Sequence, residues 1–299
     1  MEQIQTPQII KKHWYDKWYK ILLLLPVLLL IVCLIYLFLF YSQNKDIIYK
    51  DPSLAGGTTI TLRAELDSKA LESYLKRNIE DVHIRTIADI STGKQIALLI
   101  DSSAEPSILK PLVENFIGYQ LTNDNSSVEF SGPSLGRNFY KQLIIAVFIS
   151  FVLMSLVIFI LFRTFIPSIA VIFAAFADIV MTLAVVDVFK VRLSVAGIAA
   201  FLMLIGYSVD TDILLTTRVL KKRGISINQR IYSSFKTGIF MTLTGLAAVA
   251  PAFVLVTGLP DSFRQIFLIM SVGLFADIIN TWLTNASILK LYAEHKKIN

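Results

Sequence analysis

Six long apolar runs follow one another along the chain, and one long polar segment separates the first run from the other five. A helix needs roughly 20 apolar residues to cross a hydrocarbon core of about 30 Å. Each run is close to or above that length, so the pattern predicts six membrane-spanning helices. The first run is too long for a signal-peptide core and no small-residue cleavage site follows it, so we expect it to stay as an anchor. The runs are residues 21–41, 143–162, 166–189, 194–219, 238–257 and 265–286.

Lysine and arginine in the short connections predict the orientation, because these residues are retained on the cytoplasmic side. The pattern predicts a multi-pass protein of the cell membrane with cytoplasmic ends at 1–20 and 287–299, an extracytoplasmic segment at 42–138, and the remaining helices within 139–286. Three basic residues, Lys190, Arg192 and Arg264, fall in short outside connections. The residues expected inside are Lys11, Lys12, Lys17, Lys20, Arg163, Lys221, Lys222, Arg223, Arg230, Lys236, Lys290, Lys296 and Lys297.

The polar segment of about 97 residues is long enough for one small domain. Residues 59–64 alternate between apolar and polar positions, as a half-buried strand does. Asp67 can cap a following helix, and Pro106 suits the first turn of a second one. With further strands at 82–88, 95–100 and 127–130, the order is βαββαβ, which predicts a ferredoxin-like domain. The segment holds no catalytic motif, so we expect a docking or mechanical domain.

Composition agrees with a membrane protein and excludes several other classes. The 299 residues are 55% hydrophobic and 17% charged, which does not fit an ordinary soluble enzyme. The net charge of +6 is explained by the basic connections, so nucleic acid is not an expected partner. One cysteine, Cys33, and three scattered histidines provide no disulfide, metal site or catalytic triad. We therefore expect neither an enzyme nor a metal or cofactor.

Acidic residues inside the apolar runs are the main candidate functional groups, because each costs about 2.5–3.5 kcal/mol near a helix centre. Asp187 lies near an outer end and is expected to be interfacial. Asp210 and Asp212 flank Thr211 and point about 200° apart on a helix, so at most one is expected to be the central carboxylate. With Thr211 and Arg218 they form the candidate proton relay. The two acids could carry protons, or they could only hydrogen-bond to neighbouring helices, and both interpretations remain open.

Other polar and small residues in the spans have a structural interpretation. Arg218 lies about two turns beyond Asp210 and could line the same passage or extend to the membrane surface. The remaining residues are expected to form hydrogen bonds or to allow close helix approach. The expected hydrogen-bonding residues are Asp178, Asp277, Tyr207 and Ser208, and the packing glycines are Gly197, Gly206, Gly238 and Gly245.

Four motifs together resemble the SecF subunits of the SecD/SecF protein-export complex, which belong to the resistance-nodulation-division superfamily. Bacterial members of that family read Gly-Tyr-Ser-x-Asn-Asp-Thr in the fourth span, whereas this chain has Asp-Thr-Asp at 210–212, which resembles an archaeal form. The position of the proton-carrying carboxylate is therefore open between Asp210 and Asp212. The motifs are Gly56-Gly57-Thr58, Gly132-Pro133-x-x-Gly136, Arg163 with Pro167, and Gly206-Tyr207-Ser208 through Arg218.

The resemblance implies an accessory role in protein export. It implies pairing with a SecD subunit, contact with the Sec translocation channel, with translocating preproteins and with membrane lipid, and use of the proton gradient through carboxylates of the fourth span. One alternative is half of a small-molecule or lipid exporter of the same superfamily, for which the outer segment is small. Another is a structural scaffold whose acids only hydrogen-bond.

Overall fold

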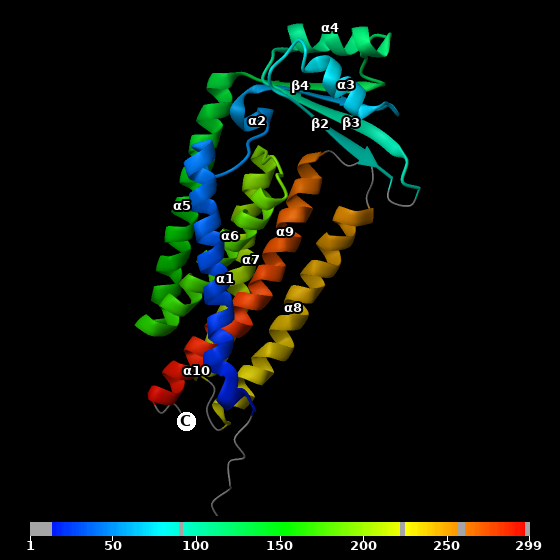
Figure 1. Cartoon of the computed structure of the whole chain (residues 1–299). Helices are drawn as coiled ribbons and strands as arrows, with labels where there is room; N and C mark the ends of the chain where they lie inside the picture. The colour runs from blue at the N-terminus through cyan, green and yellow to red at the C-terminus, as the bar shows by residue number, and fades with distance from the viewer. Residues whose placement is uncertain (1–13, 90–91, 222–224, 256–260, 297–299) are drawn as a thin grey trace, which may run out of the picture.

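A computed structural model describes residues 14–89, 92–221, 225–255 and 261–296. A helical bundle carries a small sheet domain at one end, and the last described helix ends at the opposite end (Figure 1). Part of the evidence for orientation, namely Lys11, Lys12, Lys222, Arg223 and Lys297, lies outside these residues, as does the end of the predicted span at 257.

Within the described residues, six helical segments are long and apolar enough to cross a membrane. Five are single helices, and the sixth joins two α-helices through a π-helix. The segments extend beyond the apolar runs because polar residues at their ends are also helical, so the predicted number of spans is confirmed. They are α1 (Trp14–Asn44), α5 (Pro133–Phe162), α6 (Phe165–Val188), α7 (Val195–Lys221), α8 (Ile227–Leu255) and the joined α9 (Asp261–Ile279), η1 (Asn280–Asn285) and α10 (Ala286–His295).

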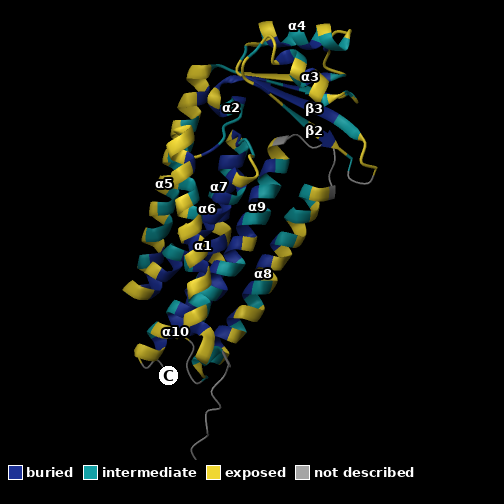
Figure 2. Cartoon of the chain, in the orientation of Figure 1, coloured by how far each residue is buried: buried dark blue, intermediate teal, exposed yellow. Residues whose placement is uncertain are grey.

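Three segments form the inside of the bundle and three form its outside (Figure 2). In the most apolar part of α6 and of α7, more than half of the residues are buried, whereas only 6% are buried in α5. Exposed leucine, isoleucine and phenylalanine side chains cover α1 and α5. Such a surface is stable only in an apolar solvent or against another apolar surface.

The sheet domain has the predicted βαββαβ order, with an added short helix, α2 (Pro52–Ala55), before the first strand. The sheet is antiparallel throughout, with strand order β2-β3-β1-β4. Asp67 accepts hydrogen bonds from two amides of α3, and Pro106 begins α4, as predicted. The elements are β1 (Gly57–Leu62), α3 (Ser68–Leu75), β2 (Val82–Ala88), β3 (Gln95–Ser102), α4 (Pro106–Ile117) and β4 (Ser126–Ser131).

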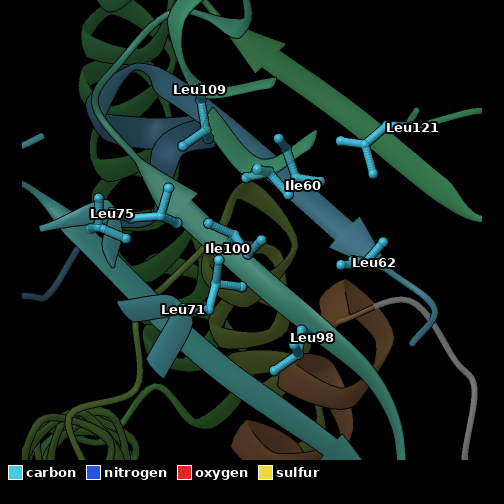
Figure 3. Close-up of a cluster of buried hydrophobic side chains, with 10 residues drawn as sticks. Ile60, Leu62, Leu71, Leu75, Leu98, Ile100, Leu109 and Leu121 are labelled. Atoms are coloured by element: carbon cyan, nitrogen blue, oxygen red, sulfur yellow. The ribbon is translucent and has the colours of Figure 1, made fainter. Parts of the chain in front are cut away.

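The core of this domain lies between one face of the sheet and the two helices α3 and α4 (Figure 3). Alternate residues of β1, Ile60 and Leu62, point into the core and are fully buried. Leu71 of α3 and Leu109 of α4 meet them there. The period of two in the strand therefore produces the predicted half-buried sheet.

Two of the sequence motifs meet at the joint between the sheet domain and α5. Gly56 has φ +89°, and a Cβ there would lie 2.4 Å from Cα of Pro133. A Cβ on Gly136 would lie 2.8 Å from the amide nitrogen of Gly56. Thr58 donates a hydrogen bond to the carbonyl of Ala104 at 2.6 Å. The glycines of the Gly-Gly-Thr and Gly-Pro-x-x-Gly motifs thus allow the backbone just before β1 to pack directly against the first turn of α5.

Substitution Gly57→Ala is expected to destabilise the sheet domain by roughly 2–4 kcal/mol. The backbone there has φ +139°, and an added Cβ would lie 2.2 Å from the carbonyl oxygen of Ser102 on the neighbouring strand. Hydrogen exchange of the full-length protein should therefore quicken in β1 and β3. Gly132→Ala is the control, because Gly132 has φ −63° and open space around it. Equal exchange in the two variants would contradict this account.

The tight connection between the second and third spans also has a local cause. Arg163 caps α5 in the left-handed conformation, with φ 52°, and its amide donates to the carbonyl of Phe159 at 2.9 Å. Pro167 is buried in the first turn of α6. Proline is tolerated there because amides of the first turn have no hydrogen-bond acceptor within the helix. These two residues therefore fix the turn between two antiparallel helices.

Candidate functional site

Three aspartates from three helices lie in one buried region of the bundle. Asp178 comes from α6, Asp212 from α7 and Asp277 from α9, and each is at most 1% exposed. The Thr281 hydroxyl connects Asp212 with Asp277, and the Ser208 hydroxyl interacts with both Asp178 and Asp277. Asp178 and Asp277 form hydrogen bonds, as expected from the sequence. The sequence did not indicate that both lie in the same polar region as Asp212.

Asp178 is held by two neighbouring helices. The Ser208 hydroxyl of α7 donates to its Oδ2 at 2.5 Å, and the Asn280 amide donates to its Oδ1 at 2.7 Å. The structure thus gives Ser208 the hydrogen-bonding place expected from the sequence. Both contacts connect α6 with the helices that carry the other two acids.

Asp212 and Asp277 approach the same hydroxyl group. The Oγ1 atom of Thr281 lies 2.9 Å from Oδ1 of Asp212 and 2.9 Å from Oδ1 of Asp277. Asn285 donates to Oδ1 of Asp212 at 2.7 Å, and Thr242 of α8 lies 3.2 Å from Oδ2 of Asp277. Oδ2 of Asp212 has no hydrogen-bond partner among the described residues. The two acids therefore differ in how many of their oxygens are satisfied.

A π-helix builds this cluster. The segment Asn280–Asn285 supplies Asn280, Thr281 and Asn285, and all three are fully buried. A π-turn inserts an extra residue into the helical repeat, and such turns are frequent at functional sites. The sequence analysis missed these three residues and Thr242. The available signal was the polar group Asn280, Thr281, Thr284 and Asn285 inside an otherwise apolar span.

Asp210 points away from this cluster. It is exposed at the surface of the bundle, and so are two other residues of the same α7 face, Met203 (53% exposed) and Tyr207 (48%). Spacings of four and three residues place them in one stripe along the helix. The structure thus separates the two candidate carboxylates, with Asp212 inside the chain and Asp210 on its outer surface. We call Met203, Tyr207 and Asp210 the α7 stripe.

The remaining candidates fall in different places. Arg218 reaches α8, where its guanidinium donates to the carbonyl of Ser233 at 2.7 Å and to Thr237 at 3.0 Å, so it does not join the acids. Thr211 is buried beside Gly238, facing α8. Arg218 and Thr211 therefore fasten α7 to α8.

Three of the four candidate glycines lie at close helix contacts. A Cβ would lie 2.9 Å from Gln265 at Gly197, 2.5 Å from Trp282 at Gly238 and 3.2 Å from Leu274 at Gly245. Gly206 has nothing within 4 Å, so packing inside this chain does not explain it. Tyr207, which was expected to form a hydrogen bond within the bundle, has one ring edge beside Gly245 of α8 and nearly half of its surface exposed.

A second buried polar group joins three helices at the end of the bundle opposite to the sheet. The Lys290 ammonium is fully buried, forms an ion pair with Asp16 of α1, and donates to Oδ1 of Asn228 of α8 at 2.6 Å. It also lies 4.8 Å and 4.9 Å from the ring centres of Tyr15 and Tyr19. A buried lysine is stable only with such partners. This group, the Lys290 junction, connects α1, α8 and α10.

In the described part of the chain, no three aspartate, glutamate, histidine or cysteine side chains are placed to hold a metal ion. The chemistry available to the cluster is hydrogen bonding and proton exchange between carboxyl, hydroxyl and amide groups.

Comparison with known proteins shows which family the chain belongs to. Residues 114–295 match the family model described as "Protein export membrane protein SecD/SecF, C-terminal". The chain belongs to the SecD/SecF protein-export family. It is 36% identical to "Protein-export membrane protein SecF" of Methanolacinia petrolearia over 90% of this chain and 92% of that protein. It is also 36% identical to the SecF of Methanocaldococcus jannaschii, over 92% and 95% of the two chains.

A solved structure of SecDF from Thermus thermophilus has the same fold, with a TM-score of 0.75 at 18% identity. The match covers 94% of this chain and 39% of that longer one. The resemblance to the SecD/SecF family inferred from the motifs is thus confirmed. Membership in the SecD/SecF family, together with six helices able to span a membrane, makes the chain a multi-pass protein-export membrane protein.

Proposed function

We propose that this chain is an accessory subunit of Sec protein export that works with a SecD-type partner and couples preprotein translocation to the proton gradient through Asp212. The observation that carries the coupling is the buried cluster of Asp178, Asp212 and Asp277, in which hydroxyl side chains connect the acids. Protonation of these acids changes the hydrogen bonds between α6, α7 and α9. Those changes move the helices that support the sheet domain.

Energetics favour proton exchange over a purely structural role. An ionised carboxylate away from water is costly, and the side chains that hydrogen-bond to these three acids are neutral hydroxyls and amides. Neutral amides could form a structural contact of this kind without that cost. Moving one elementary charge through 100 mV supplies about 2.3 kcal/mol, which is comparable with the energy of several such hydrogen bonds.

The same proposal includes the orientation of the chain in the membrane. Four basic residues occupy helix ends on the side opposite to the sheet domain: Arg163 caps α5, Arg218 is in the last turn of α7, Arg230 is near the start of α8 and Lys290 is in α10 (Figure 1). By the distribution of lysine and arginine, that end is cytoplasmic, and the sheet domain faces the outside of the cell membrane. Preproteins leaving the Sec channel emerge on that outer side.

The α7 stripe supports pairing with a second six-span subunit. Asp210 is exposed far from either end of α7, where lipid cannot satisfy a carboxylate. Met203 and Tyr207 of the same face are also uncovered. A partner helix with polar groups would satisfy Asp210 and bury both neighbours. The relatives are named for protein export, so the alternative of a half exporter for small molecules or lipids has no comparable support.

Photo-crosslinking is expected to locate this partner. A photoreactive residue in place of Met203 should give a high yield of covalent dimer with the SecD-type subunit in native membranes. The same residue in place of Phe148, which is 67% exposed on α5, should give a low yield. Both positions are apolar and exposed, so local reactivity is matched. Equal yields at the two positions would contradict the assignment of the α7 stripe as the interface.

The coupling itself is tested in vesicles that contain the whole export complex. Translocation of a preprotein should be faster with an imposed proton gradient than without it, and a protonophore should remove the difference. A gradient effect that is the same with and without this chain would reject the proposed function.

A further inference from the structure

The Thr281 hydroxyl lies between the carboxyl groups of Asp212 and Asp277, and this position requires one of the two acids to be protonated. It lies within hydrogen-bond distance, 2.9 Å, of a carboxyl oxygen of Asp212 and of a carboxyl oxygen of Asp277. A threonine hydroxyl has one hydrogen to donate, and its oxygen can accept. It can donate to only one carboxylate, so the second short contact needs a carboxylic acid that donates to the Thr281 oxygen. Both contacts are therefore satisfied when the pair holds one proton.

The two acids beside Thr281 differ in whether their second carboxyl oxygen has a hydrogen-bond partner. Oδ2 of Asp277 has Thr242 beside it, whereas Oδ2 of Asp212 and Oδ1 of Asn285 have no partner among the described residues. Asp212 and Asn285 are both fully buried. An unsatisfied carboxyl oxygen in the middle of a bundle is a place where a proton or a water molecule binds. Asp212 is thus the member of the pair with an oxygen available for exchange.

We propose that Thr281 relays a proton between Asp277 and Asp212, and that these two acids hold a single proton in common. In the transfer, the proton on Oδ1 of Asp277 moves to Oγ1 of Thr281 while the hydroxyl hydrogen of Thr281 moves to Oδ1 of Asp212. One O–H bond breaks and one forms at Thr281, so the hydroxyl is regenerated. Asp277 becomes a carboxylate and Asp212 becomes the acid.

The relay rests on the proposed proton coupling and gives Thr281 a direct part in it. Transfer reverses the donor and acceptor roles on both sides of Thr281, which belongs to η1. The same segment holds Asp178 through Asn280 and Asp212 through Asn285. The position of the proton thus decides which of α7 and α9 receives the stronger hydrogen bond from this segment.

Proton flux into vesicles containing the complete complex tests the relay. Thr281→Val keeps the shape of the side chain and removes the hydroxyl, so flux should fall by about 100-fold. Thr281→Ser keeps a hydroxyl and should stay within about threefold of the wild type. Thr284→Val is the matched control and should keep flux near the wild-type level, because Thr284 lies in the same π-helix, is buried, and its hydroxyl has no hydrogen-bond partner among the described residues. Flux near the wild-type level in Thr281→Val would overturn the relay.

Infrared spectroscopy of the complex tests the shared proton independently of flux and of the Thr281 variants. A single shared proton contributes one component to the infrared C=O stretching band of protonated carboxyl groups. Asp212→Asn and Asp277→Asn should each remove that same component, since the two acids hold the proton as a pair. Losses that add up to two components would overturn the shared proton. If the wild type shows the shared band and no gradient-driven flux, the proton-coupled function fails while the shared proton stands.

Discussion

Replacement of Asp212 by asparagine is expected to lower gradient-driven protein secretion by about 100-fold, the scale of effect seen when a proton-transfer group is removed. Asparagine has nearly the same shape, and its amide can still meet Thr281 and Asn285, so the bundle should remain folded. What disappears is the proton-accepting oxygen at a position that is fully buried. Secretion of a reporter protein in cells, with immunoblots for chain abundance, measures the effect.

Asp210→Asn is the control for that variant. Asp210 lies two residues away and is exposed on the α7 stripe, so its replacement should weaken contact with the partner subunit and leave proton exchange in the buried cluster intact. Overproduction of the partner subunit distinguishes the two variants. Excess partner should restore secretion in Asp210→Asn by mass action and should not restore it in Asp212→Asn. Secretion in Asp212→Asn cells at the wild-type rate would reject the assignment of the proton-carrying group.

Asp16→Ala is expected to lower the free energy of unfolding by about 3–5 kcal/mol, because it leaves a buried lysine without its ion-pair partner. Lys290 is fully buried in the Lys290 junction, and its remaining contacts there are with Asn228, the rings of Tyr15 and Tyr19, and Glu294 at 3.7 Å. The partly exposed Glu294 cannot replace Asp16 fully. Unfolding in mixed detergent micelles, followed by circular dichroism, measures the loss.

A second substitution distinguishes an unpaired charge from lost packing. Lys290→Met removes the buried charge and keeps most of the side-chain volume, so the double variant Asp16→Ala, Lys290→Met should be more stable than Asp16→Ala alone. If the double variant is less stable than the single one, the ion pair is not the reason for the effect of Asp16.

Much of the architecture follows from the sequence through simple periodicities. The length of each apolar run sets the number of spans, because a helix of fixed rise must cross a core of fixed thickness. Alternation at residues 59–64 predicts the first strand of the sheet, since side chains of a strand alternate between its faces. In the structure that strand runs from Gly57 to Leu62. Asp67 and Pro106 mark helix starts because their local chemistry acts within one turn.

The candidate site was only partly predictable. Helical geometry places Asp210 and Asp212 on different faces of α7, and the structure has one outside and one inside. Periodicity cannot tell which face is covered, because that depends on which helices pack against α7. Asp178 and Asp277 look isolated in the sequence and are joined to Asp212 in space by Ser208, Asn280 and Thr281.

The sequence by itself therefore determined the elements: six spans, a ferredoxin-like domain, and a family resemblance carried by motifs that lie at the joint to α5, at the turn between α5 and α6, and along α7. The tertiary structure alone decided which acids share a site and which side of α7 stays uncovered. The physical reason is helix packing, which brings Thr281 of the π-helix Asn280–Asn285 within 2.9 Å of both Asp212 and Asp277. A side chain's partner depends on the packing of helices that are distant in sequence, and no local pattern contains that information.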